Sequence, residues 1–382
     1  MRAGWVRATS NNSSYLTIYQ TVVTDSSSRI QRVASNVMQS LFQSTRTSFL
    51  TTFPEMTFEP AAEADRICQA LRGALANDFV RRGYVVAMSG GVDSAVCAAL
   101  AAQAVGSDRV FGLFLPERES DPQSLTLATN CAARLGIAHA SSDITAILEA
   151  IGCYVNRDAA IRRVVPEYGS GWKCKLALPS AGSGARRLNV TSLIVEDPDG
   201  RQRRLRPGPT EYRQIVAATN FKQRVRTMMT YYEADRLHFA VVGTPNRLEY
   251  DQGFFVKGGD GLADIKPIAH LYKSQVYQLA HWMGIPEEIV SRPPTSDTFS
   301  LRQSQEEFFF SLPPRLLDQL LLAYNAEQPV TEAAREASLG EEEVSSAWSD
   351  IVQKRRTTRY LHLGAVLVEP IELAREATDT EA

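Results

Sequence analysis

The sequence predicts an α/β fold: a doubly wound parallel sheet with flanking helices, an inserted subregion and a helical C-terminal region. Two observations support this fold class. Apolar, β-branched runs at residues 84–88 and 109–116 are each followed by a helical pattern, at 95–105 and 124–137. A short glycine turn separates the first run from its helix. Because strands that alternate with helices usually pair in parallel, both units are expected in one sheet.

An amphipathic helix is expected before the first strand, over residues 57–80. Its apolar pattern recurs every fourth residue, at Ile67, Leu71, Leu75 and Phe79, so these side chains share one helix face. That face should pack on the sheet.

Composition divides the chain into three parts. Residues 1–55 are rich in Ser and Thr, as transit peptides also are, and are expected to be a disordered N-terminal extension without a catalytic role. Residues 56–300 hold the predicted catalytic domain, which is interrupted by a Gly-, Pro- and Arg-rich insertion at about 152–213. Within the insertion, residues 188–206 predict a β-hairpin. Residues 301–382 are expected to form a helical C-terminal region and tail.

The core resumes after the insertion. Residues 214–237 have a helical pattern, residues 238–243 a strand pattern, and residues 273–284 a second helical pattern that closes the core. Residues 302–360 are expected to be helical and accessory.

Composition excludes several classes of function. Of 382 residues, 41 are Lys or Arg and 43 are Asp or Glu, so the net charge of −2 offers no global field to recruit nucleic acid or an anionic membrane. No apolar run approaches the roughly 20 residues needed to span a bilayer. The five cysteines form no CxxC pair and no metal-ligand spacing, which predicts buried, reduced thiols in a cytoplasmic protein.

The hexapeptide SGGVDS, which starts at Ser89, stands where the first strand ends and its helix begins. Backbone N–H groups and the positive end of a helix converge there, so the spot suits a pyrophosphate. Gly90 and Gly91 allow close backbone approach, Ser89 and Ser94 supply hydroxyls, and Asp93 can hold Mg²⁺ against phosphate oxygens. The sequence has no GxxxxGK[ST] motif, so this is not a Walker A loop.

This loop resembles the PP-loop of ATP pyrophosphatases, which split ATP between the α and β phosphates. Residues 241–297 then read VVGTPNRLEYDQGFFVKGGDGLADIKPIAHLYKSQVYQLAHWMGIPEEIVSRPPTSD. They resemble the NAD synthase signature, G-T-x-N/D-x-x-E, G-F/Y-F-x-K-x-G-D-G-x-A-D, P-I/L-x-x-L-x-K-x-Q-V and P-P-T/S-x-D. With NFKQRVR at 220–226, the resemblance covers most of residues 60–360 apart from the insertion. It implies an adenine nucleotide alpha hydrolase-like fold.

The resemblance also implies a chemistry. NAD synthases are carbon–nitrogen ligases that activate the carboxylate of nicotinic acid adenine dinucleotide with ATP and Mg²⁺, and ammonia then displaces AMP from the acyl-adenylate. By resemblance, ATP and pyrophosphate would contact Ser89, Gly90, Gly91, Asp93, Ser94, Thr244, Lys273 and Thr295. The metal ligands would be Asp93 and Glu249. The catalytic residues would be Asp93, Lys273 and Asp260.

The acceptor substrate would contact Asn220, Arg224, Phe254, Lys257, Asp260, Asp264 and Lys354. The residues themselves leave other roles open, since Phe254 is equally suited to core packing and to stacking on a base. Asp260 and Asp264, four apart in a glycine-rich loop, could steer ammonium or form hydrogen bonds to the adenylate.

Four departures from the signature concern mainly the acceptor side. They are the long insertion, the loop ERESDPQS at 117–124, Gln353 where a His often precedes Lys-Arg, and Pro245. Because these departures concern the acceptor side, two acceptors stay open. The first choice is nicotinic acid adenine dinucleotide, and the alternative is a different carboxylate in a specialised or surface-sugar pathway. A PP-loop tRNA-modifying enzyme fits less well, because it would need paired or catalytic cysteines and a basic RNA-binding region. A non-catalytic nucleotide-binding protein also fits less well, because it would be expected to lack Asp93, Glu249 or Lys273.

The expected partners follow from the same resemblance. The chain contains no setting for a glutaminase cysteine, so ammonia would come free or from a separate glutaminase. NAD synthases are typically homodimers, and a homodimer is implied here. Neither a nucleic acid nor a membrane partner is expected.

Overall fold

The computed structural model describes residues 58–178, 191–295 and 298–369. The expected N-terminal extension lies outside these residues, as do the middle of the insertion and the end of the C-terminal tail.

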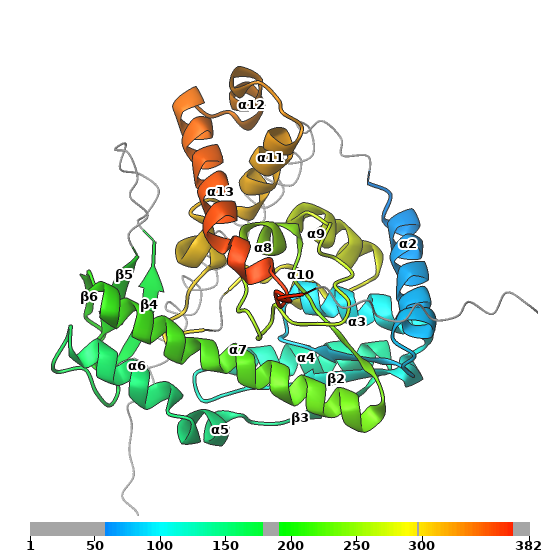
Figure 1. The fold of residues 1–382 in the computed structure, drawn as a ribbon, viewed down its shortest axis with the longest axis horizontal. Coiled ribbons are helices and arrows are strands. Elements are labelled where there is room, and N and C mark those ends of the chain that lie inside the picture. Colours follow the sequence, from blue (N-terminus) through cyan, green and yellow to red (C-terminus); the bar gives the residue numbers. More distant parts are fainter. Residues whose placement is uncertain (1–57, 179–190, 296–297, 370–382) are drawn as a thin grey trace, which may run out of the picture. The chain divides into compact units, whose positions relative to one another are not determined.

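Four parallel strands form the central sheet in the order β3-β2-β1-β7 (Figure 1). The strands are β1 (Tyr84–Ala87), β2 (Val110–Phe114), β3 (Ala138–Ser141) and β7 (Ala240–Val242). Tyr84 of β1 pairs with Val110 on one side and with Ala240 on the other. The strand order runs outward from β1 in both directions, and such a switch point is where open α/β sheets bind ligands.

Helices cover both faces of this sheet, which confirms the doubly wound arrangement. One face carries α2 (Pro60–Gly73), α3 (Val92–Val105), α4 (Pro122–Leu135) and α9 (Lys273–Trp282). The other carries α5 (Thr145–Ala150) and α7 (Pro209–Leu237). Because side chains alternate along a strand, Tyr84 and Val86 enter the first core and Val85 enters the second.

The predicted element boundaries hold with small differences. Helix α4 ends as expected at Gly136, whose φ of +66° gives a left-handed cap. Helix α2 ends earlier than predicted, at Gly73, and a π-helical turn at Ala74–Asp78 continues it. Helix α7 begins earlier than its apolar pattern, at Pro209, because proline is well suited to the first helical turn.

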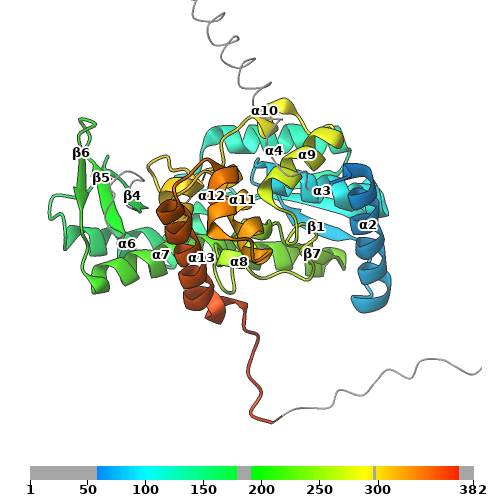
Figure 2. The same cartoon turned by 90° about the horizontal axis from the view of Figure 1, so that it is seen from above.

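The insertion contains the predicted hairpin and two elements that the sequence did not reveal. Strands β5 (Ser192–Glu196) and β6 (Gln202–Leu205) form the hairpin, and β4 (Lys173–Ala177) pairs antiparallel with β5. In Figures 1 and 2 this sheet lies beside α6 (Cys153–Arg162) and the start of α7, away from the parallel sheet. Helix α6 was not predicted because Arg157, only 2% exposed, interrupts the apolar pattern of its buried face.

The C-terminal region is helical, as expected. It contains a π-helical turn at Glu306–Phe310, followed by α11 (Pro314–Asn325), α12 (Val330–Ala337) and α13 (Glu341–His362). Short helices α8 (Arg247–Gln252) and α10 (Glu287–Val290) precede it. The segment 298–307, named the strap below, connects this region to the core. Within the described ranges, every helix is too short or too polar to cross a membrane.

Candidate active site

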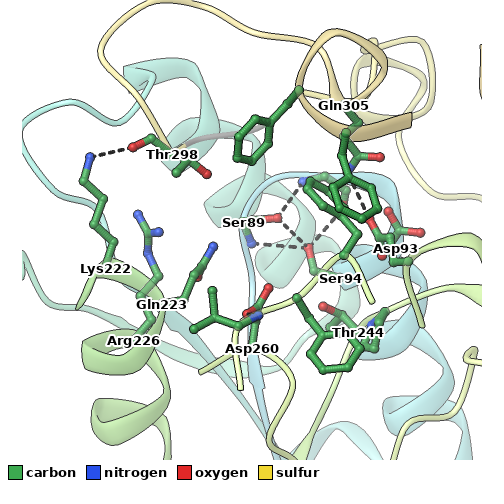
Figure 3. Close-up of a pocket in the computed structure, with 18 of the residues that line it drawn as sticks. Ser89, Asp93, Ser94, Lys222, Gln223, Arg226, Thr244, Asp260, Thr298 and Gln305 are labelled. Carbon is green, nitrogen blue, oxygen red and sulfur yellow. Dashed lines mark hydrogen bonds between the residues drawn. The ribbon is translucent and has the colours of Figure 1, made fainter. Parts of the chain in front are cut away.

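A cavity of about 1100 Å³ opens at the carboxyl ends of β1, β2 and β7 (Figure 3). Its wall includes Ser89 after β1, Thr244 after β7, Lys222 of α7, Gln305 of the strap and Lys354 of α13. Small-molecule sites usually measure roughly 300–1,000 Å³. The cavity is therefore large enough for an enzyme that must hold two substrates together.

The PP-loop forms one end of the cavity. Gly90 adopts a φ of +75°, and a Cβ there would lie 2.4 Å from the carbonyl oxygen of Ser124, so only glycine fits. Gly91 is the N-cap of α3. The Ser94 hydroxyl donates to the Gly91 carbonyl at 3.0 Å and accepts from the Ser89 N–H at 3.3 Å. These bonds fix the loop around the positive end of α3, where an anion is stabilised.

Asp93 of this loop forms a partly buried ion pair. The Lys273 ammonium, on α9, pairs with the Asp93 carboxylate at the start of α3. The Asn246 amide donates to the other Asp93 oxygen at 3.0 Å. Three segments that lie far apart in the sequence thus bring a lysine, a carboxylate and an amide together beside the phosphate-binding loop.

Glu249 joins this group through the first turn of α8. Its backbone N–H donates to the Asn246 side chain at 3.2 Å, and its carboxylate accepts from the Asn246 N–H at 3.1 Å, which makes a capping box. The Gln305 amide donates to the remaining oxygen at 2.9 Å. Desolvation and then the charge of Asp93 raise the pKa of Glu249 to about 7.

Lys273 is held in a charged state. Desolvation acts to lower its pKa, but the charges of Asp93 and Glu249 prevail and raise the pKa above its ordinary value. Asp318 of α11 fixes the helix that carries the lysine, since its carboxylate accepts from the backbone N–H groups of Lys273 at 3.2 Å and Ser274 at 2.7 Å. The ammonium therefore points into the site from a rigid base.

The residues fit a magnesium ion that phosphates would help to bind. Among the described residues, no cluster of three or more His, Cys, Asp or Glu side chains could hold a metal alone. Mg²⁺ in nucleotide sites usually takes only one or two protein carboxylates, with phosphates and water completing its shell. Asp93 and Glu249 are two such carboxylates. Burial and then the charge of Asp93 raise the pKa of Glu249, and a divalent cation between the two carboxylates would offset both effects.

The structure brings most of the sequence-predicted residues to this cavity. Its lining includes Ser89, Gly91, Asp93, Ser94, Asn220, Arg224, Thr244, Glu249, Phe254, Lys257, Asp260, Lys273, Thr295 and Lys354. Phe254 belongs to an aromatic wall, where it stacks on Phe309 at a centroid distance of 4.9 Å and meets Phe308 and Phe310 edge-on. The two roles that the sequence left open for Phe254 are thus compatible, because it packs on other rings and still faces the cavity.

Two predicted acceptor contacts have structural partners. The Asp264 carboxylate accepts from the Val241 N–H at 2.7 Å and from the Tyr231 hydroxyl at 3.1 Å, and it is not part of the cavity lining. The Lys257 ammonium lines the cavity but donates to the Tyr360 carbonyl at 2.9 Å, at the end of α13. Asp264 anchors its loop to β7, so its geometry gives no support to a substrate contact.

Further residues at or beside the cavity were not predicted from the sequence. Asn246 could have been found, because Asn-x-x-Glu is a capping-box pattern. Gln305 carries no local signal, since its contact with Glu249 joins residues 56 positions apart. Lys222 stands inside the NFKQRVR segment, but within that segment the family resemblance implies a role only for Asn220 and Arg224.

Lys222 lies at the centre of a buried ionic cluster at the far side of the cavity (Figure 3). Its ammonium contacts Glu117 at 2.9 Å, Glu119 at 2.7 Å and the Thr298 carbonyl at 3.0 Å. Arg157 of α6 contacts Glu119 at 2.7 Å. The loop ERESDPQS, noted above as a departure, is thus tied to α6, α7 and the strap.

The inserted sheet holds the strap against the cavity. Leu301 donates its N–H to the Cys174 carbonyl at 3.1 Å, and Leu178 donates to the Glu307 carbonyl at 2.9 Å. The Lys175 ammonium binds the Glu307 carboxylate at 2.8 Å. The strap carries Gln305 and leads into the aromatic wall, and Leu176 and Leu178 of the insertion line the cavity themselves. The insertion therefore shapes the cavity both directly and through the strap.

Comparison with known proteins agrees with this geometry. The sequence profile of the NAD synthase family matches residues 63–164 and 202–361. A protein of Rhizobium meliloti (strain 1021), named NH(3)-dependent NAD(+) synthetase, is 55% identical over 317 residues, which span 83% of this chain and 94% of that protein. A protein of the same name from Thermotoga maritima is 39% identical over 67% of this chain and 84% of its own length.

Two solved structures share the fold. An NMN synthetase from Francisella tularensis has a TM-score of 0.55 at 20% identity, over 81% of this chain and 98% of its own. An NH3-dependent NAD synthetase from Campylobacter jejuni has a TM-score of 0.53 at 20% identity, over 81% of this chain and all of its own. The profile match, the identity to the curated relatives and the arrangement around the PP-loop lead to one conclusion: the chain belongs to the NAD synthase family.

Proposed function

We propose that this protein joins ammonia to the carboxylate of nicotinic acid adenine dinucleotide, with cleavage of ATP to AMP and pyrophosphate. The observation that carries the proposal is the Lys273–Asp93 ion pair beside Glu249, in a loop whose backbone N–H groups and hydroxyls suit a pyrophosphate. Family membership and the name of the Rhizobium relative supply the acceptor and the ammonia dependence.

The site residues have two functions: they position the phosphates and they stabilise the charge that develops during the reaction. The PP-loop N–H groups and the hydroxyls of Ser89 and Ser94 hold the leaving pyrophosphate. Lys273 offsets the charge that builds on the α-phosphate as the carboxylate attacks. Asp93 and Glu249 would hold Mg²⁺, which supplies charge neutralisation on the phosphates. The adenylate carbonyl is then reactive enough for ammonia, so no protein nucleophile is needed.

The decisive experiment incubates the purified protein with ATP, Mg²⁺ and ammonium, with and without nicotinic acid adenine dinucleotide. We expect equal amounts of pyrophosphate and NAD, measured by a coupled assay and by mass spectrometry. Pyrophosphate without NAD would refute this acceptor and direct the search to a mononucleotide or another carboxylate. Absence of pyrophosphate release with every acceptor would refute the ligase assignment itself.

The strap contact gives a test of how the insertion serves this reaction. Replacing Lys175 with Met removes two hydrogen bonds between β4 and the strap, to the Glu307 carboxylate and to the Arg302 carbonyl, so the wall formed by Gln305 and the aromatic rings should loosen. We expect the KM for the acceptor to rise about three- to tenfold, corresponding to roughly 1 kcal/mol, with little change in the KM for ATP.

Lys173 provides the matched control on the same strand. It is 55% exposed at its side chain and pairs with Glu196, inside the inserted sheet. Lys173→Met should leave both KM values unchanged. Equal effects of the two variants would show that the strap contact does not govern the acceptor site.

We further propose a homodimer, because the family resemblance implies one, and a cytoplasmic location, because all five cysteines are buried and unpaired. Ammonia would enter free or from a separate glutaminase. Light scattering coupled to size-exclusion chromatography would test the dimer, and a monomer at micromolar concentration would contradict it.

A further inference from the structure

An arginine beside the PP-loop has no role in the function described so far. Arg292 follows α10, and its side chain lines the cavity while being 15% exposed. Its guanidinium donates to the Ser124 hydroxyl at 3.0 Å and to the Asp121 carboxylate at 3.2 Å. Both partners lie at the start of α4, so the arginine joins that helix end to the segment that leads to Thr295.

The position of Ser124 places this arginine next to the phosphate-binding loop. The Ser124 carbonyl oxygen is the atom that a Cβ on Gly90 would strike, so Ser124 packs directly on the PP-loop backbone. The guanidinium is bonded to the side chain of the same residue. Arg292 is thus separated from the PP-loop by a single residue.

The charge around Arg292 is not balanced as it is at other cations of the cavity. Lys273 faces two carboxylates, Asp93 and Glu249. By contrast, Arg292 shares the carboxylate of Asp121 with Arg302, which binds it at 2.8 Å. Because Asp121 is shared between two guanidinium groups, it offsets the charge of Arg292 only in part.

The PP-loop needs such a charge. Lys273 is the cation directly below it, and the two carboxylates there outnumber that lysine. A bound triphosphate brings several negative charges, which one Mg²⁺ only partly offsets. A guanidinium carries five N–H donors in a planar fork, and two of them are used in the contacts above, so donors remain for phosphate oxygens.

We propose that Arg292 is a phosphate-binding residue that contacts the pyrophosphate portion of ATP and holds it after cleavage. The proposal rests on the proposed ATP-cleaving function and adds a residue to it. It also gives Asp121 a role: this carboxylate positions the guanidinium when phosphate is absent.

The test compares Arg292→Met with Arg302→Met in the intact chain. Arg302 binds the same carboxylate, but its side chain is 83% exposed and is not part of the cavity lining. Titration calorimetry with magnesium pyrophosphate and with MgATP should show affinity at least tenfold weaker for Arg292→Met and less than twofold weaker for Arg302→Met. Arg292→Lys, which keeps the charge without the fork, should lie between them.

The outcomes separate this inference from the proposed function. If both Met variants bind magnesium pyrophosphate as the wild type does, or weaken it equally, the role of Arg292 is refuted even when NAD is formed. If Arg292→Met does not fold by circular dichroism, Arg292→Lys decides, and unchanged affinity in that variant refutes the proposal. Wild-type protein that binds phosphate tightly but makes no NAD would contradict the proposed acceptor and leave the Arg292 comparison intact.

Discussion

Asp93→Asn should reduce turnover by about 10³-fold, because one substitution removes both a proposed metal ligand and the partner of Lys273. The amide keeps the shape of the side chain and its neighbours but loses the negative charge. Glu249 would then be the only carboxylate facing the Lys273 ammonium. The loop would also lack the Asp93 carboxylate, which is one of the two proposed metal ligands. Steady-state release of pyrophosphate at saturating ATP and acceptor is the measurement.

A suitable control for this variant is Asp108→Asn. Asp108 is an exposed carboxylate in the short turn that follows the other end of α3, so its loss should leave turnover unchanged. Circular dichroism should show that both variants are folded. Near-normal turnover of Asp93→Asn would remove the central support for the proposed chemistry.

Lys222→Met should lower the free energy of unfolding by about 3–5 kcal/mol, the usual cost of removing one partner from a buried ion pair. The side chains of Lys222 and Glu117 are 1% and 0% exposed. Without the lysine, the carboxylates of Glu117 and Glu119 could not be rehydrated unless the structure opened. Urea unfolding at neutral pH, followed by fluorescence, measures the loss.

An ion pair with exposed side chains provides the control for Lys222→Met. Arg118 and Glu149 form an ion pair whose side chains are 43% and 55% exposed, so Arg118→Met should cost at most about 1 kcal/mol. A loss for Lys222→Met no larger than that for Arg118→Met would mean that the cluster is not desolvated as the structure describes.

The same cluster predicts a pH dependence. Burial alone would raise the pKa of Glu119, but Arg157 and Lys222 lower it to about 2, against an ordinary value of 4.5. Since the folded pKa is the lower one, this carboxylate stabilises the fold above pH 4.5 and loses that contribution as the pH falls toward 2. The difference between wild type and Lys222→Met should therefore shrink over this range.

Local chemistry explains which parts were predictable. The strand–loop–helix around Ser89, the left-handed cap at Gly136 and the hairpin of β5 and β6 each depend on a few neighbouring residues. Their signals are turn residues, glycine and periodic apolar side chains, which act over one or two helical turns. The parallel sheet followed from repetition of the first unit.

Long-range polar contacts explain what was not predictable. Lys222 meets Glu117 across 105 positions, and in the sequence each reads as an ordinary surface charge. Helix α6 was not predicted for the same reason. Its buried Arg157 has the sequence pattern of a residue on the exposed, polar face of a helix. The hydrogen bonds of Asp264 to Val241 and Tyr231 were likewise not predictable, and the acceptor contact that the resemblance implies for Asp264 stays a prediction.

The way the insertion meets the strap has an evolutionary consequence. Main-chain groups of Cys174 and Leu178 make two of its contacts, and such bonds do not depend on which side chain the residue carries. Outward-facing positions of β5 and β6 can therefore diverge while the wall that they support keeps its shape. Sequence drift at those outward-facing positions is thus uncoupled from substrate choice, and comparisons among relatives should locate specificity in the strap and in the insertion residues that line the cavity, such as Leu176 and Leu178.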